Sequence, residues 1–255
     1  AKVIFYYPKP EFFTEFYNPD TDIILSLEDT RSAHINLLAL IKNSRDLNRL
    51  VASIIPSALK SSEEGWVVMS RAILSGIFVY SLKNDLKTMK ELRALALLPF
   101  SNLLDLLLNT EGTEQAIQFL DIDEKQQTIN QSVFSSKIAF ISEYPVQDCP
   151  PLKNGYIDFE KFFIANGRRT VWILGDDNEE KEKLKRTVSI AIELASTAVF
   201  SLGEDSNRKI YFFIDEFSEL KKMDSLQKLI VKGRSYGASI FLLMQNPFQL
   251  KKTYG

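Results

Sequence analysis

The chain has 255 residues, enough to bury a substantial core as one large domain or two small ones. Its hydrophobic fraction of 45% and charged fraction of 25% are typical of ordinary globular proteins, and its net charge of −2 lacks the chain-wide positive footprint of many nucleic-acid binders. A single cysteine, Cys149, and a single histidine, His34, exclude an internal disulfide framework and a metal site of the Cys/His type. The longest uncharged stretches, such as 72–82, are shorter than the roughly 18–20 residues that span a bilayer.

Strand signals lie towards both ends of the chain. Apolar and aromatic runs predict strands at 2–7, 22–26, 169–175, 209–214 and 238–244. The last three runs are almost continuously apolar, a pattern typical of parallel strands that are covered on both faces. Helical patterns at 178–202 and 224–232 separate these three. The alternation predicts right-handed crossovers and a mainly parallel, doubly wound α/β sheet.

The middle of the chain has a different pattern. Between 44 and 143 only helical patterns occur, and one of them places Trp66, Met69, Ile73, Ile77 and Tyr80 on a single apolar stripe. This predicts an all-α domain over 41–150, inserted into a discontinuous α/β domain made of 1–40 and 151–255, with 144–155 as the returning linker. The helical segment has more acidic than basic side chains, so protein–protein contact is at least as good an interpretation as duplex binding.

Two acidic residues follow a buried strand directly. The apolar run 210–214 continues into Asp215 and Glu216, and unpaired buried charge is costly, so these acids need a partner. One interpretation is that they cap the helix that follows. The other is the Walker B pattern, in which the first acid holds Mg²⁺ through water and the second orients or deprotonates the attacking water.

Two further polar residues flank the next strand. Arg234 lies before that strand, at the end opposite to the acids, and Gln245 lies at its carboxyl end. A parallel strand beside the Walker B strand would bring Gln245 near a γ-phosphate, whereas Arg234 would reach only the nucleotide of a neighbouring subunit. The simpler alternatives are a solvated charge at a helix end for Arg234 and a helix cap for Gln245.

At these residues the sequence resembles a known family. The stretch "IYFFIDEFSEL…LIVKGRSYGASIFLLMQNPFQLKKTYG" is similar to the TraD/TrwB branch of type IV secretion coupling proteins, the DNA-pumping ATPases of bacterial conjugation. The similarity extends to "VWILGDDNEEKEKLKRTVSIAIELASTAVFSL" and to the amino-terminal 40 residues, which include an Asp-Ala-Arg-like turn at 29–31.

The resemblance implies a RecA-like P-loop NTPase sheet interrupted by an all-α domain. It implies ATP and Mg²⁺ as cofactors of the full-length protein, with a catalytic set of Asp215, Glu216, Arg234 and Gln245. Within this set Asp215 and Gln245 also bind the nucleotide, and Asp215 holds the metal through water. The implied partners are DNA, relaxosome or other secretion substrate proteins, secretion-channel components and, in the full-length protein, five further copies in a homo-hexamer. The implied location is the cytoplasmic face of the bacterial inner membrane.

One departure from the family pattern is clear. No G-x-x-x-x-G-K-[ST] loop occurs in the 255 residues, so we expect the phosphate-binding loop to lie upstream of Ala1, and the chain by itself to be inactive and monomeric. Two alternatives to a conjugation motor stay open. One is a catalytically silent docking module for secretion substrates, and the other is a related septal or packaging-type DNA translocase.

Overall fold

The computed structural model describes residues 1–8, 11–144, 155–175, 181–244, 246 and 248. The chain forms two compact units, which are described separately here. Unit 1 consists of Ala1–Ile35 and Gln147–Gly255, and unit 2 is Asn36–Val146. From the sequence, the corresponding divisions were placed at 40/41 and 150/151, and these stay predictions of where the folding units end.

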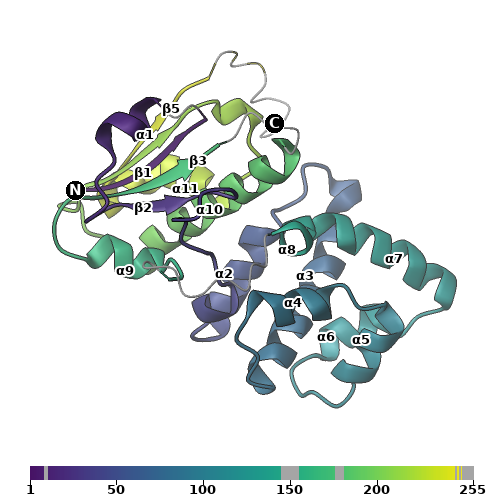
Figure 1. The fold of residues 1–255 in the computed structure, drawn as a ribbon. Coiled ribbons are helices and arrows are strands. Elements are labelled where there is room, and N and C mark those ends of the chain that lie inside the picture. The colour runs from purple at the N-terminus through teal and green to yellow at the C-terminus, as the bar shows by residue number, and fades with distance from the viewer. Residues whose placement is uncertain (9–10, 145–154, 176–180, 245, 247, 249–255) are drawn as a thin grey trace. The chain divides into compact units, whose positions relative to one another are not determined.

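Unit 1 is built on a five-stranded, all-parallel sheet with the order β2-β3-β1-β4-β5 (Figure 1). Parallel pairing was predicted from the alternation of strands and helices, and it is confirmed. The central strand β1 pairs with β3 on one side and β4 on the other, so that Lys2 lies beside both Arg169 and Ile210. The strands are β1 (Lys2–Tyr7), β2 (Ile23–Leu25), β3 (Arg169–Leu174), β4 (Ile210–Ile214) and β5 (Ala238–Leu242).

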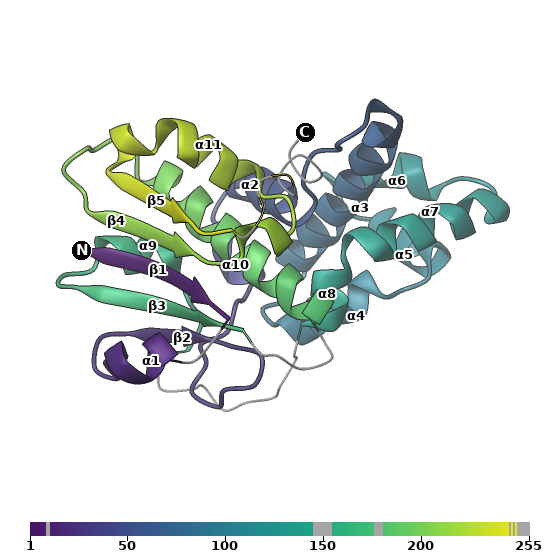
Figure 2. The same ribbon diagram turned by 90° about the horizontal axis from the view of Figure 1, so that it is seen from above.

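The direction of each crossover decides which face of the sheet its helix covers. The chain moves from β1 out to β2 and later returns through β3 and β4 to β5, and right-handed connections in opposite directions lie on opposite faces. Accordingly α1 lies on one face, and α9, α10 and α11 lie on the other (Figures 1 and 2). These helices are α1 (Glu11–Phe16), α9 (Phe159–Ile164), α10 (Lys181–Ser201) and α11 (Asp224–Lys232).

The two faces of the sheet are unequally buried. Towards α10 the strands present fully buried aliphatic and aromatic side chains, including Ile4, Phe212 and Ile214. On the opposite face the side chains of Phe5, Tyr211 and Phe213 are only half-buried, and Phe241 is 46% exposed. The prediction of full cover on both faces therefore holds for β3, with four consecutive buried residues, and fails for β4 and β5, because only α1 covers this face among the described residues.

Unit 2 contains only helices among its described residues. Side-chain caps begin several of them: Asn43 accepts from two backbone N–H groups at the start of α2, Thr88 and Glu91 form a capping box on α4, and Asp123 caps α7. The helices are α2 (Ser44–Ile54), α3 (Glu64–Lys83), α4 (Met89–Ala96), α5 (Phe100–Leu107), α6 (Glu114–Leu120), α7 (Glu124–Lys137) and α8 (Ala139–Glu143).

The long helix α3 is the centre of unit 2. With the 3₁₀ turn before it, the helical stretch Ser61–Lys83 is the one helix in the described part of the chain that is long and apolar enough to cross a membrane, and half of its most apolar window is buried. Such burial is expected for the core helix of a helical unit. The uncharged stretch 72–82 is shorter than this helix because Arg71 lies within the helix and interrupts the uncharged run. The Arg71 guanidinium donates to the Ile55 carbonyl.

Candidate active site

The two acids follow β4 at the carboxyl edge of the sheet, as predicted. The Asp215 N–H donates to the Tyr6 carbonyl at 3.1 Å, which fixes the first acid between β1 and β4. The Glu216 N–H donates to Asp215 Oδ1 at 2.8 Å, and Glu216 itself has a left-handed backbone with φ 48° and ψ 34°. A non-glycine residue in this region costs about 1–2 kcal/mol, and backbone strain of this kind concentrates at functional sites.

Neither acid caps the helix that follows. Glu216 precedes a 3₁₀ turn, Phe217–Glu219, without any side-chain hydrogen bond to that turn. The next helix, α11, starts later, and its N-cap residue Met223 has no capping side chain. The backbone N–H groups of its first turn bind instead to Glu193 of α10. The capping interpretation of the acids therefore has no support in these contacts.

The strand β5 runs beside β4 and continues next to the acids. The Leu243 N–H donates to the Ile214 carbonyl at 2.9 Å, and the Phe217 N–H donates to the Leu243 carbonyl at 3.0 Å. The chain after β5 thus passes the backbone on either side of Asp215 and Glu216. Gln245, the predicted γ-phosphate sensor, lies outside the described residues, so its role stays a prediction.

Arg234 lies at the opposite end of β5. It belongs to a 3₁₀ turn, Gly233–Tyr236, between α11 and β5, and its side chain is exposed. There it lines a cavity of about 370 Å³ together with Arg208, Lys209 and Tyr211. The five residues of β5 span roughly 16 Å, so Arg234 and Asp215 of one chain do not meet. This separation is the one that a trans role requires.

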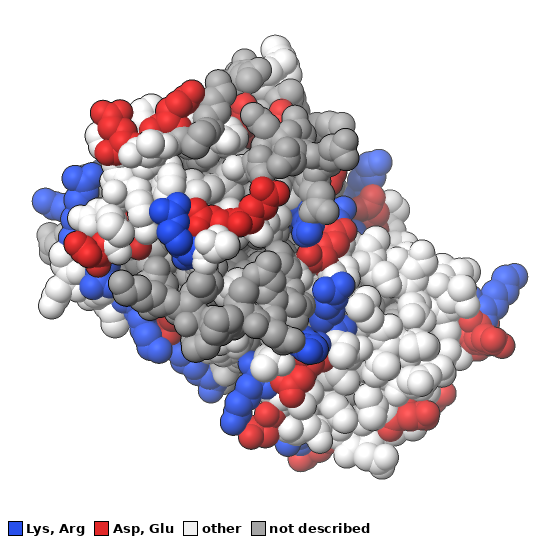
Figure 3. Space-filling view, in the orientation of Figure 1, with Lys and Arg blue, Asp and Glu red and all other residues white. Residues whose placement is uncertain are grey.

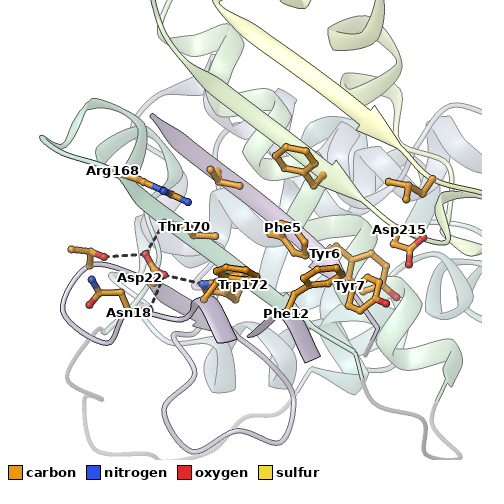
Figure 4. A pocket seen from close by; sticks show the side chains of 15 residues that line it. Phe5, Tyr6, Tyr7, Phe12, Asn18, Asp22, Arg168, Thr170, Trp172 and Asp215 are labelled. Carbon is orange, nitrogen blue, oxygen red and sulfur yellow. Dashed lines mark hydrogen bonds between the residues drawn. The ribbon is translucent and has the colours of Figure 1, made fainter. Parts of the chain in front are cut away.

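Asp215 also lines a larger cavity on the half-covered face of the sheet (Figure 4). The cavity has a volume of about 850 Å³, with Asp215 at one end and a polar group around Asp22 and Arg168 at the other. Aromatic rings line the space between the two ends: Phe5, Tyr7, Phe12, Trp172 and Phe213. Sequence analysis missed this cavity, although the alternate aromatic positions in "KVIFYY" and "KIYFFI" were a signal for a distinct sheet face.

Asp22 holds the polar end of this cavity together. The residue is 8% exposed, and its carboxylate accepts from the Thr170 N–H at 3.0 Å, the Trp172 indole N–H at 2.9 Å, the Asn18 N–H at 3.1 Å and the Thr21 hydroxyl at 3.1 Å. Four donors satisfy a buried carboxylate well. Asp22 therefore fixes the loop after α1 to β3, and its hydrogen bonds give it a structural role.

The electrostatics around the acids are negative. The pKa of the Tyr6 hydroxyl is raised well above its usual value, first by burial and then by the charges of Glu216, Glu219 and Asp215. Asp215 is half-buried, and no other described residue donates to its carboxylate besides the Glu216 N–H. A hard cation such as Mg²⁺ prefers carboxylate oxygens and retains several waters, so the donor set fits magnesium. The described residues contain no cluster of three or more His, Cys, Asp or Glu that could hold a metal alone, so the remaining ligands would be water and phosphate.

Comparison with known proteins decides the family. A sequence model of the type IV secretion-system coupling protein DNA-binding domain matches residues 1–255. The chain belongs to this family. The coupling protein TraD of Escherichia coli (strain K12) is 24% identical over 264 residues, which cover 99% of this chain and 35% of TraD. This coupling-protein domain therefore spans about a third of the length of that relative.

Solved structures agree with the fold. The bacterial conjugative coupling protein TrwB without its first 70 residues superposes with a TM-score of 0.83 at 23% identity, covering all of this chain and 58% of that one. TrwB in complex with ADP and Mg²⁺, and TrwB with a non-hydrolysable ATP analogue, each superpose with a TM-score of 0.84 and are covered over 59% of their length. The coupling-protein domain thus has the RecA-like NTPase fold with its helical insertion, as the sequence predicted.

Proposed function

We propose that this domain is the motor core of a conjugative type IV coupling protein, which uses ATP hydrolysis to recruit DNA with its attached protein and to pump both to the secretion channel. The observation that carries the proposal is the placement of Asp215 and Glu216 at the carboxyl end of β4, with neither acid used as a helix cap. Ligands of open α/β sheets bind at this edge.

Each acid has a distinct role in this proposal. Asp215 holds Mg²⁺ through water, and the ion when bound neutralises charge on the β- and γ-phosphates. Glu216, the next residue, orients the attacking water and accepts its proton while the bond between the γ-phosphorus and the leaving ADP oxygen breaks. The left-handed backbone of Glu216 turns the chain sharply at this point, which supports a positional demand on its side chain.

The phosphate-binding loop would come from chain preceding residue 1. The half-covered sheet face and the outer edge of β5 support this proposal, because they leave a place for one more strand beside β5 and one more helix on the aromatic face. A right-handed crossover from a strand beyond β5 to β1 puts its helix on the same face as α1. Phosphate would then meet the helix N-terminus and the loop lysine near Asp215.

Assembly and partners follow from the same function. A homo-hexamer on the cytoplasmic face of the inner membrane would place Arg234 of one subunit against the nucleotide of its neighbour. Figure 3 shows both basic and acidic side chains on the described surface of the visible face. DNA would be contacted by residues brought together in the ring, while the helical unit offers a surface for relaxosome proteins.

The test uses the intact protein with its preceding segment. Asp215→Asn and Glu216→Gln should each abolish ATP turnover without loss of the fold, and Glu216→Gln should still bind ATP because the metal residue is kept. Glu204→Gln, which neutralises an exposed acid elsewhere in unit 1, is the matched control and should keep full activity. Near-wild-type hydrolysis in either site variant would overturn the Walker B assignment, whereas no hydrolysis by the intact wild type would favour the catalytically silent docking module.

A further inference from the structure

The segment that connects the two acids to α11 is attached along its length to a single helix. Residues 219–226 lie against a polar stripe of α10 whose members recur every three or four positions and therefore share one helix face. The stripe consists of Glu182, Lys185, Ser189, Glu193 and Thr197. Each of these side chains contacts the segment. Glu182 binds Lys221 Nζ, Lys185 pairs with Glu219, and Ser189 accepts from the Lys221 N–H. Glu193 accepts from the N–H groups of Ser225 and Leu226, and Thr197 donates to Ser225 Oγ.

Glu193 makes the most buried of these contacts. It is 2% exposed, and its two carboxylate oxygens accept from the Ser225 N–H at 2.8 and 2.9 Å and from the Leu226 N–H at 3.2 Å. These N–H groups belong to the first turn of α11, which has no capping side chain of its own. A carboxylate at a helix N-terminus is also favoured by the helix dipole. Glu193 is thus the cap of α11, supplied from another helix.

Ser189 anchors the segment closer to the acids. Its hydroxyl donates to the Lys185 carbonyl at 2.6 Å and accepts from the Lys221 N–H at 2.9 Å, so it is used in both directions. The neighbouring Lys185–Glu219 ion pair, at 3.0 Å, is partly exposed and contributes less. Only four residues of chain lie between Glu216 and Lys221, the residue that Ser189 holds.

The fixed segment joins two candidate functional groups. Glu216 directly precedes this segment, residues 217–226. Its carboxyl end continues as α11, a rod of nine residues and roughly 13 Å that leads to Arg234. If the start of α11 moved away from Glu193, both Glu216 and Arg234 would therefore move with it. Glu216 is the candidate base of this subunit, and Arg234 is the arginine proposed to reach its neighbour. A misplacement of about 1 Å can cost a hundredfold in rate.

We propose that Glu193, assisted by Ser189, is a positioning residue of the ATPase site, which holds the segment 217–226 and through it both Glu216 and Arg234. The inference rests on the proposed function. In contrast to the proposed roles of the acids, Glu193 is buried against α11 and would act without touching the nucleotide or the attacking water. Its removal should lower the rate of chemistry and leave nucleotide affinity unchanged.

The experiment measures steady-state ATP hydrolysis of the intact protein, well below its melting temperature. Glu193→Ala should lower kcat at least tenfold, with the KM for ATP within about twofold of wild type. Glu193→Gln keeps one acceptor oxygen, so its kcat should lie between those of wild type and Glu193→Ala. Val199→Ala is the matched control, since Val199 is a fully buried residue on another face of α10 and its truncation destabilises the fold without touching the stripe. It should lose stability and keep kcat.

ATP hydrolysis by mixed subunits is a second measurement, and a loss of stability alone would not change its outcome. Mixtures of Glu216→Gln and Arg234→Ala subunits should regain activity, whereas Glu193→Ala subunits should rescue neither, because they misplace both groups. Val199→Ala subunits with a similar loss of melting temperature should rescue both. Rescue of both partners by Glu193→Ala would overturn the proposal.

If both Glu193 variants fail to fold, Ser189→Ala decides the matter. This nearly isosteric change leaves the Lys221 N–H without its acceptor and should lower kcat about threefold at unchanged KM; a wild-type kcat would overturn the proposal. Failure of the proposed function has a different signature, since the intact wild type would then show no hydrolysis, or Glu216→Gln would retain it in full, whatever Glu193 does.

Discussion

Arg234 is exposed at the amino end of β5, beside Arg208 and Lys209. Within one chain it lies a strand length from Asp215, so in the proposed motor it would act at the site of another subunit. A guanidinium can donate two parallel hydrogen bonds to phosphate oxygens, which a lysine cannot do. Position and chemistry together make Arg234 the candidate for completing the site of a neighbour.

Arg234→Ala should therefore be nearly inactive alone in the intact protein, because arginine fingers contribute on the order of 10³–10⁵ in rate. Mixed with Glu216→Gln subunits it should regain part of the activity, since some interfaces then pair an intact Glu216 with an intact Arg234. Hydrolysis measured against the mixing ratio checks this expectation.

Two controls make the mixing experiment decisive. Mixtures of each variant with wild type must keep activity, which establishes that subunits exchange and that the ring tolerates inactive neighbours. Lys232→Ala removes a positive charge two residues away on α11 and should behave as wild type. If the mixture of Arg234→Ala and Glu216→Gln subunits were inactive while the control mixtures were active, Arg234 would not act in trans.

At the scale of elements, the contact between α3 and α6 requires a glycine. A Cβ atom at Gly76 would lie 2.6 Å from the Ala116 Cβ and 3.1 Å from a Leu107 methyl carbon, too close for either neighbour to remain in place. A Cβ at Gly65, in the first turn of the same helix, would meet nothing within 4 Å. Both glycines thus have the backbone conformation of a helix, but only Gly76 is closely packed against a neighbouring helix.

Gly76→Ala should destabilise the protein by about 1–3 kcal/mol, because overpacking outweighs the gain of up to about 1 kcal/mol in helix propensity. Gly65→Ala, its matched control, should be neutral or slightly stabilising. Urea unfolding followed by circular dichroism measures both. Equal midpoints for the two variants would show that α3 and α6 can move apart without cost.

At the scale of the whole molecule, the 255 residues hold the candidate acids but no glycine-rich phosphate loop. The domain by itself should therefore show no appreciable ATPase activity and little or no nucleotide affinity, because the β- and γ-phosphates lack most of their backbone donors and the lysine. Calorimetry with ATP and Mg²⁺ tests this, and sedimentation should show a monomer. Micromolar binding would reveal a second phosphate site.

The elements with strong periodic patterns could be predicted from sequence. The strands predicted at 2–7 and 169–175 and the helix predicted at 224–232 agree with the structure to within one residue, because their apolar runs are bounded by charged or turn-forming residues. The acids after β4 could be placed for the same reason. The family and the RecA-like fold are confirmed, whereas the roles of the four site residues remain predictions.

Other features depend on contacts between distant parts of the chain. Asp22 and its partner Thr170 are separated by 148 positions, and nothing near either residue announces the pairing. In the sequence Glu193 is one polar residue of a helix, and its contact with α11, 32 positions away, becomes visible only in the structure. The left-handed backbone of Glu216 is also invisible, because glycine or asparagine usually marks such a turn.

The central position of β1 has a consequence for synthesis. Its two neighbours in the sheet, β3 and β4, begin at residues 169 and 210, and the whole of unit 2 is encoded between β1 and these strands. At roughly 5–20 residues per second on the ribosome, β1 is followed by its partner β3 only after about 8–33 s and by β4 after about 10–40 s. The helical unit, with its local contacts, can fold within this interval. The five strands can therefore pair completely only after β3, β4 and β5 have followed, when unit 2 has already been synthesised.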